Sequence, residues 1–194
     1  MRTFLSIDLD FWNQHQKIQH VRAFLQKAKD SCDNVIIVDS HENLRKHVGK
    51  NGCDHLINVD FHSDIWDRHN PKNKLWDKRE YSCGSWVNFV SPKNRLLYTW
   101  IHPHGNTPNR GYCCHGANPL TEEGRKHSGW KMTEMIASKK PECHIRWEQV
   151  TTIGVAFSYD WLEFKDDWGF KVQAVAEKIF GKIPKADGRK ARLG

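Results

Sequence analysis

The sequence has no long apolar run, no biased tract and no export signal. Its apolar runs, such as residues 35–38, are far shorter than the roughly 20 residues that a membrane span needs. With 7 Pro, 13 Gly and no low-complexity segment, the composition excludes a disordered or fibrous chain. The N-terminus shows neither the basic start nor the apolar core of a signal peptide, so we expect a cytoplasmic protein without a membrane partner.

Paired cysteines are also missing, because none of the six cysteines forms a Cys-x-x-Cys motif. Zinc-binding domains usually carry such pairs, and disulfide frameworks belong to exported chains, so the expectation is reduced thiols. The adjacent residues Cys113, Cys114 and His115 are the one cysteine cluster that would suit a minor metal site.

The net charge of +7 permits nucleic-acid binding but does not argue for it, since no recognition motif accompanies it. Much of the excess lies near the C-terminus, where five basic residues face only Asp187. We interpret residues 182–194 as a basic tail, which is either solvated or a binding arm. The preceding residues 1–181 are interpreted as a single domain, because no internal repeat or linker interrupts them.

Five short apolar runs have the pattern of strands that are buried on both faces of a parallel sheet. They cover residues 3–9, 34–39, 55–60, 95–102 and 151–158. Helices are predicted over residues 17–29 and 42–48, near residues 122–138, and over residues 170–180. Strand–helix alternation predicts an α/β fold with three layers, α/β/α, around a mainly parallel sheet.

Acidic and histidine residues gather at the ends of three predicted strands. Residues two apart in an extended chain point to the same side, and the carboxyl ends of parallel strands meet at one edge of the sheet. The side chains that we expect to converge there are Asp8, Asp10, His41, Asp60, His62 and Asp64.

A structural role is the alternative for each residue taken alone. A single Asp after a strand is more often a cap or turn residue, and an isolated His41 would more often be a capping or packed histidine. Clustered buried carboxylates, however, repel one another and cost several kcal/mol unless a cation neutralises them. The presence of all three clusters in one chain therefore favours a metal site.

The ligand types indicate which metal is expected. Four carboxylates and two imidazoles suit Mn²⁺ better than structural Zn²⁺, although Zn²⁺, Fe²⁺ and Co²⁺ also accept such ligands. Six protein ligands exceed what one open catalytic ion takes, whereas two ions about 3.5–4 Å apart would use them all. The sequence thus predicts a metallohydrolase domain with two Mn²⁺ ions per chain.

The motifs around these residues resemble those of the arginase/agmatinase ureohydrolases. Residues 60–64 are similar to the Asp-Ala-His-x-Asp motif, and residues 6–10 to the Ser-x-Asp-x-Asp motif. His41 is similar to the His of Gly-Gly-Asp-His. The likeness is strongest to the small peptide-arginase family, which converts arginine side chains of a peptide to ornithine. It covers about residues 3–90 and implies a ureohydrolase (arginase/deacetylase)-like fold.

The resemblance implies a ligand set for each ion. Asp60 and Asp8 would bridge both ions, His41 and Asp64 would complete one site, and His62 and Asp10 the other. Two features depart from the classical ureohydrolases. Their Ser-x-Asp-x-Asp motif comes late in the chain but opens this one, so the fold would be permuted and reduced. The strand that supplies their guanidinium-binding Glu has no obvious equivalent here.

Further site residues are expected on the loops after the strands. His102 and His104 are candidates for protonating the leaving amine, or else surface-loop histidines. The candidates for the guanidinium-binding acid, in falling order of preference, are Glu163, Glu42, Asp160 and Glu80. Ser85 follows the metal motif where the family has a substrate-lining loop, and the neighbouring Trp86 is interpreted as a core residue.

The expected function is hydrolysis of the guanidino group of arginine within a peptide, giving ornithine and urea. The peptide preference rests on the resemblance and on the short chain, which has little material to enclose a free amino acid. A precursor peptide with an acidic recognition segment is the expected partner, because it would suit the basic surface. The alternatives are a deacetylase-like amide hydrolase, a free-guanidino ureohydrolase, a two-metal phosphoesterase and, as a non-enzyme, a basic nucleic-acid-binding protein.

Overall fold

The protein is an α/β structure built on one parallel sheet. The computed structural model describes residues 1–12, 16–50, 52–62, 64, 86–90, 97–103, 132–158 and 167–182. Within them, six strands lie in the order β2-β6-β1-β3-β4-β5, and each neighbouring pair is parallel. The strands are β1 (Thr3–Asp8), β2 (Val35–Val38), β3 (His55–Val59), β4 (Leu97–His102), β5 (Met132–Ala137) and β6 (Val150–Ala156). The α/β class and the parallel sheet predicted from the sequence are confirmed.

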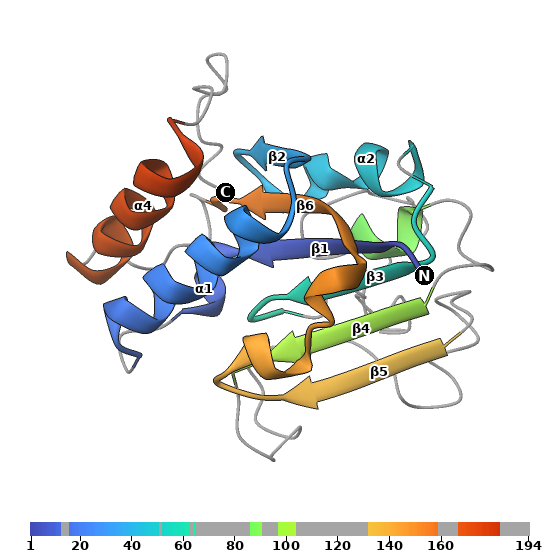
Figure 1. Ribbon diagram of the computed structural model, residues 1–194, viewed down its shortest axis with the longest axis horizontal. Coiled ribbons are helices and arrows are strands. Elements are labelled where there is room, and N and C mark those ends of the chain that lie inside the picture. Colours follow the sequence, from blue (N-terminus) through green and yellow to red (C-terminus); the bar gives the residue numbers. More distant parts are fainter. Residues whose placement is uncertain are drawn as a thin grey trace, which may run out of the picture.

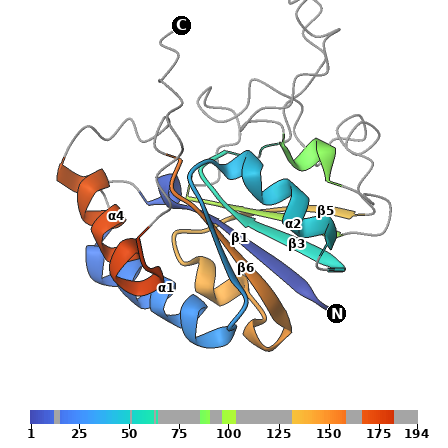
Figure 2. The same cartoon turned by 90° about the horizontal axis from the view of Figure 1, so that it is seen from above.

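Helices cover both faces of the sheet. The helices α1 (Ile18–Ser31) and α4 (Asp167–Phe180) lie side by side on one face, and α2 (Arg45–Lys50) lies on the other, as Figures 1 and 2 show. Five short 3-10 helices complete the described elements: η1 (Leu9–Phe11), η2 (His41–Leu44), η4 (Trp86–Phe89), η6 (Pro141–His144) and η7 (Trp147–Gln149). None of the described helices is long and apolar enough to cross a membrane.

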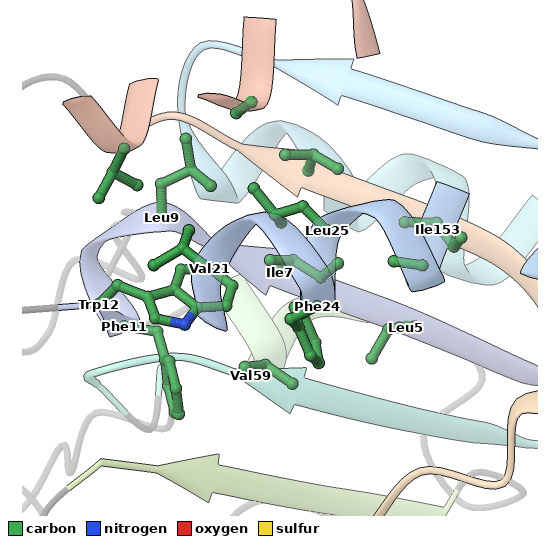
Figure 3. Close-up of a cluster of buried hydrophobic side chains, with 14 of the residues drawn as sticks. Leu5, Ile7, Leu9, Phe11, Trp12, Val21, Phe24, Leu25, Val59 and Ile153 are labelled. Atoms are coloured by element: carbon green, nitrogen blue, oxygen red, sulfur yellow. The ribbon is translucent and has the colours of Figure 1, made fainter. Parts of the chain in front are cut away.

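The central strand β1 is buried on both faces, which explains its continuous apolar sequence. Leu5 and Ile7 face α1, where Phe24 and Leu25 pack over them in the larger core cluster (Figure 3). Phe4 points the other way, into a second cluster that contains Leu44, Trp86 and Tyr98. The two clusters fix the sheet between its helical layers and leave the carboxyl ends of the strands to form the site.

The described elements that come next after β1 and β3 lie on opposite faces of the sheet. After β1 the chain enters α1 on one face, whereas α2 and η4 lie on the other face (Figure 2). β1 and β3 are neighbours in the sheet, so a crevice is expected outside their carboxyl ends. This is the edge at which the acidic motifs stand.

The helix predicted near residues 122–138 is wrong for its last part, because residues 132–137 form the strand β5. Met132, Met135 and Ile136 have the spacing of one helical face, but pairing with β4 decides the conformation. Residues 122–131 lie outside the described part of the chain, as do Cys113, Cys114 and His115. The described cysteines Cys32, Cys53 and Cys143 are free thiols, and Cys53 is buried.

Candidate metal centre

The structure brings together all six side chains predicted to converge. Asp8 is the last residue of β1, and Asp10 lies one turn on, in η1. His41 opens η2 directly after β2, and three further residues follow β3. These three are Asp60, His62 and Asp64.

The first ligand group consists of Asp8, His41, Asp60 and Asp64. The Nδ1 atom of His41 lies 3.0 Å from Oδ2 of Asp8, 3.1 Å from Oδ2 of Asp60 and 2.9 Å from Oδ2 of Asp64. One ring nitrogen carries at most one proton, so it cannot satisfy three carboxylates by hydrogen bonding. All four residues are at most 5% exposed. Asp8, His41 and Asp60 each offer a ligand atom within 4.8 Å of the others, so this buried group could hold a cation, with the Asp64 carboxylate beside His41.

The second ligand group consists of Asp10, Asp60 and His62. The Nδ1 atom of His62 lies 3.1 Å from Oδ2 of Asp10 and 3.9 Å from Oδ1 of Asp60. Asp60 therefore belongs to both groups, with one oxygen toward each. The His62 side chain is 33% exposed, so this group is open where the first is closed.

Three of the carboxylates divide their two oxygens between the backbone and the site. The Oδ1 atoms of Asp8, Asp10 and Asp60 accept backbone N–H bonds from residues 10, 61 and 62, at 3.2, 3.3 and 2.8 Å. Their Oδ2 atoms face the imidazoles of His41 and His62. A backbone N–H thus orients each carboxylate, from a local turn for Asp8 and Asp60 and from beyond the neighbouring strand β3 for Asp10.

Neutral side chains hold the ligand candidates from behind. Ser6 Oγ shares a hydrogen bond of 2.6 Å with Nε2 of His41, which turns Nδ1 toward the carboxylates. Ser158 Oγ donates to Oδ2 of Asp8 at 2.6 Å, and Asn58 Nδ2 donates to Oδ2 of Asp60 at 3.1 Å. Such buried partners fix the direction of each side chain before any ion binds.

The surroundings of Asp60 and Asp10 disfavour the ionised form of both carboxyl groups. Burial and the nearby Asp64 carboxylate raise the pKa of Asp60 from 3.8 to about 7. Burial, together with Asp8 and Asp60, raises the pKa of Asp10 well above its ordinary value. Burial and the neighbouring carboxylates thus favour the neutral form of both groups, and a cation in the cluster would favour the ionised form.

The two imidazoles respond in the opposite sense. Burial lowers the pKa of His41, but the carboxylates of Asp64 and Asp8 outweigh it, and the pKa lies well above 6.5. Burial likewise opposes the charged form of His62, yet its hydrogen bond to Asp10 brings its pKa to about 10. Without a metal ion, the protonated imidazoles thus supply the positive charge that would otherwise come from divalent cations. The donor set fits oxygen- and imidazole-binding divalent ions, and both groups can hold one.

The other predicted site residues are placed only in part. His102 ends β4, is 3% exposed, and stacks on the ring of Trp100 with centroids 4.4 Å apart; it belongs to neither ligand group. Glu42 follows His41 in η2 and accepts a hydrogen bond from Ser40 Oγ. Five candidates lie outside the described residues: His104, Glu163, Glu80, Ser85 and Asp160.

The sequence reasoning missed several residues that support the site. Ser158 follows β6 with a φ of +43°, and only the position of β6 beside β1 brings it to Asp8. Trp86 is buried as expected, but it also donates its indole N–H to Asp64. The contact of Asn58 with Asp60 could have been predicted, because Asn58 stands two residues before Asp60 and so lies on the same side of the strand.

Comparison with known proteins gives no family for this chain. No protein-family model, curated protein or solved structure matches it. The chemistry of the site is therefore inferred from its own residues.

Proposed function

We propose that this chain is a ureohydrolase-like dinuclear manganese hydrolase that converts arginine residues of a peptide to ornithine and urea. The observation that carries the proposal is the pair of carboxylate–imidazole groups that share Asp60. A shared carboxylate between two adjacent cation sites is the arrangement that two-metal hydrolases use. The motif resemblance described above narrows this chemistry to guanidine hydrolysis.

The donor set supports Mn²⁺ at both positions. Asp8, His41, Asp60 and Asp64 would hold the first ion. Asp10, His62 and the shared Asp60 would hold the second, with Asp8 as a further bridge. When bound, two divalent ions supply Lewis acidity and lower the pKa of water, which guanidine hydrolysis near neutral pH requires.

The protein side chains supply orientation and access. The residues of the first group are at most 5% exposed, whereas the His62 side chain is one-third exposed. We infer that the substrate approaches beside His62 and Asp10. A planar, permanently charged guanidinium needs a carboxylate there, and Glu42, Glu80, Asp160 and Glu163 remain the candidates.

The proton donor to the leaving amine is proposed among the histidines at the end of β4. His102 occupies that end in the structure, and His104 follows it in the sequence. A histidine suits this step because its ordinary pKa lies near neutrality.

A peptide substrate fits the charge of the whole chain. The net charge of +7 disfavours capture of a small free cation such as arginine, but it favours a peptide with an acidic recognition segment. The basic residues 182–194 are the proposed contact for that segment.

The test is mass spectrometry of arginine-containing peptides, with and without an acidic segment, after incubation with the Mn²⁺-loaded protein. Each conversion should remove about 42 Da, the change for hydrolysing a guanidine to an amine, and release urea. Asp60→Asn should abolish it. Efficient hydrolysis of free arginine with no modified peptide would refute the peptide assignment. Two bound ions without any urea would refute guanidine hydrolysis.

Deacetylase-like amide hydrolysis is the second candidate, because Asp8, His41 and Asp60 of the first ligand group could hold one ion without the second group. Elemental analysis separates the two proposals. One ion per chain, with release of acetate from an acetyl-lysine peptide, would favour the amide hydrolase.

A further inference from the structure

Asp64 is the ligand candidate whose position the strand geometry does not explain. It stands four residues beyond Asp60, past the end of β3, and its φ is +51°. An Asp tolerates this left-handed conformation, but neighbouring structure must maintain it. Yet its side chain is buried, with Oδ2 placed 2.9 Å from Nδ1 of His41.

The side chain that holds Asp64 there is Trp86. Its indole N–H donates to Oδ2 of Asp64, the same oxygen that faces His41. Its ring also lies against the His41 imidazole, with centroids 4.9 Å apart and planes at 48°. Trp86 is fully buried in η4 and belongs to the second core cluster, together with Leu44 and Val48.

We propose that Trp86 is a positioning residue that holds Asp64 and His41 in place for the first metal ion. This inference rests on the metal centre of the proposed function, but not on the reaction it performs. A carboxylate oxygen has two lone pairs, so Oδ2 can accept the indole N–H and still bind a cation. The indole itself offers no lone pair that would compete as a ligand.

A second tryptophan shows that burial alone does not require this contact. Trp100 is also buried, in the same core cluster, and donates its N–H to the backbone carbonyl of Asp60 at 3.0 Å. Both indoles satisfy their donor, but only Trp86 does so on a ligand carboxylate. Trp100 is therefore a matched control for the loss of one indole N–H from this core.

The test compares Trp86→Phe with Trp100→Phe by titration calorimetry with Mn²⁺ and by elemental analysis after desalting. Each variant keeps an aromatic ring and loses one N–H. Trp86→Phe should weaken one of the two ions by about 10–100-fold, the usual loss when a ligand's supporting partner is removed. Trp100→Phe should keep both affinities close to wild type. Equal losses in the two variants, or wild-type affinities in Trp86→Phe, would overturn the proposal.

A double-mutant cycle tests whether Trp86 affects metal affinity through Asp64. In the Asp64→Asn background, Trp86→Phe should cause little further loss of affinity, because the ligand that it positions is gone. A full additive loss would show that Trp86 acts elsewhere and would count against the proposal.

If Trp86→Phe does not fold, the wild-type protein still gives an answer. The indole N–H resonance of Trp86 should shift when diamagnetic Zn²⁺ fills the first group, and an unchanged resonance would overturn the proposal. A protein that binds two ions but hydrolyses no guanidine would refute the proposed function alone. A protein that binds no metal would refute both.

Discussion

Replacing Asp60 by Asn tests two effects of this carboxylate: its destabilisation of the metal-free protein and its contribution to Mn²⁺ binding. Asp60 is 1% exposed and belongs to both ligand groups. Its pKa is raised from 3.8 to about 7, chiefly by burial and by Asp64. At about 1.36 kcal/mol per pKa unit, the ionised form is destabilised by roughly 4 kcal/mol relative to the neutral form. Asn keeps the shape of the side chain and removes the charge.

The raised pKa sets the direction of the pH dependence. Between pH 3.8 and about 7, folded Asp60 retains a proton that the unfolded chain has lost. The free energy of unfolding of the metal-free protein therefore falls as the pH rises through this window. At pH 8 the metal-free Asn variant should melt at a higher temperature than the metal-free wild type, and near pH 4 the difference should vanish.

Added Mn²⁺ should reverse this order. Wild type gains about 2.7 kcal/mol when the free ion is 100 times its dissociation constant. The variant has lost the shared ligand and should gain much less.

The assay is thermal unfolding at pH 4 and pH 8, with chelator or with Mn²⁺. The exposed Asp33 supplies the control, since Asp33→Asn removes the same charge outside the cluster and should track wild type. A metal-free Asp60→Asn that melts below wild type at pH 8 would refute the electrostatic reasoning. A wild type that Mn²⁺ does not stabilise would refute the metal centre.

Three further perturbations test other parts of the structure. Burial lowers the pKa of His55 to about 4, so protonation of this residue should lower the free energy of unfolding by up to roughly 3 kcal/mol as the pH falls from 6.5 to 4, and solvent screening should reduce that value. His55→Gln should remove this part of the pH dependence in urea titrations. A Cβ on Gly154 would lie 2.7 Å from both Cδ atoms of Leu44, so Gly154→Ala should lower the unfolding free energy by about 1–3 kcal/mol, and a wild-type urea midpoint would contradict this packing. His62→Asn should keep the first ion and lose the second, whereas Asp60→Asn should lose both; elemental analysis that finds the same metal content in the two variants would contradict the division into two groups.

The convergence of the ligand candidates could be predicted where it follows from simple geometry. Asp8 and Asp60 stand at the ends of adjacent parallel strands, and that edge is common to the whole sheet. His41 follows a third strand of the same sheet. Strand direction was sufficient to place Asp8, His41 and Asp60 together, whereas Asp10 lies in η1 and Asp64 has a left-handed φ, so a period of two does not explain their positions.

The supporting contacts could not be predicted, because they join residues that only the tertiary fold brings together. Ser158 reaches Asp8 across 150 positions, and Trp86 reaches Asp64 across 22. No local pattern marks either pair. The strand β5 was missed for a related reason, since its pairing with β4 overrides a sequence that has helical spacing.

The structural and metal-binding interpretations of the acidic motifs turn out to be compatible. Asp8 and Asp60 each accept through Oδ1 the backbone N–H two residues on, as turn and cap residues do, and Asp10 accepts through Oδ1 the N–H of Phe61 beyond the neighbouring strand β3. A cap alone would not require the other oxygen to be buried against an imidazole and further carboxylates, because an exposed carboxylate caps as well. Here Oδ2 is turned inward in all three residues, at 3.0–3.1 Å from a histidine nitrogen. The backbone contacts hold each carboxylate in one orientation, and the buried repulsion that results is the cost that a bound cation would offset.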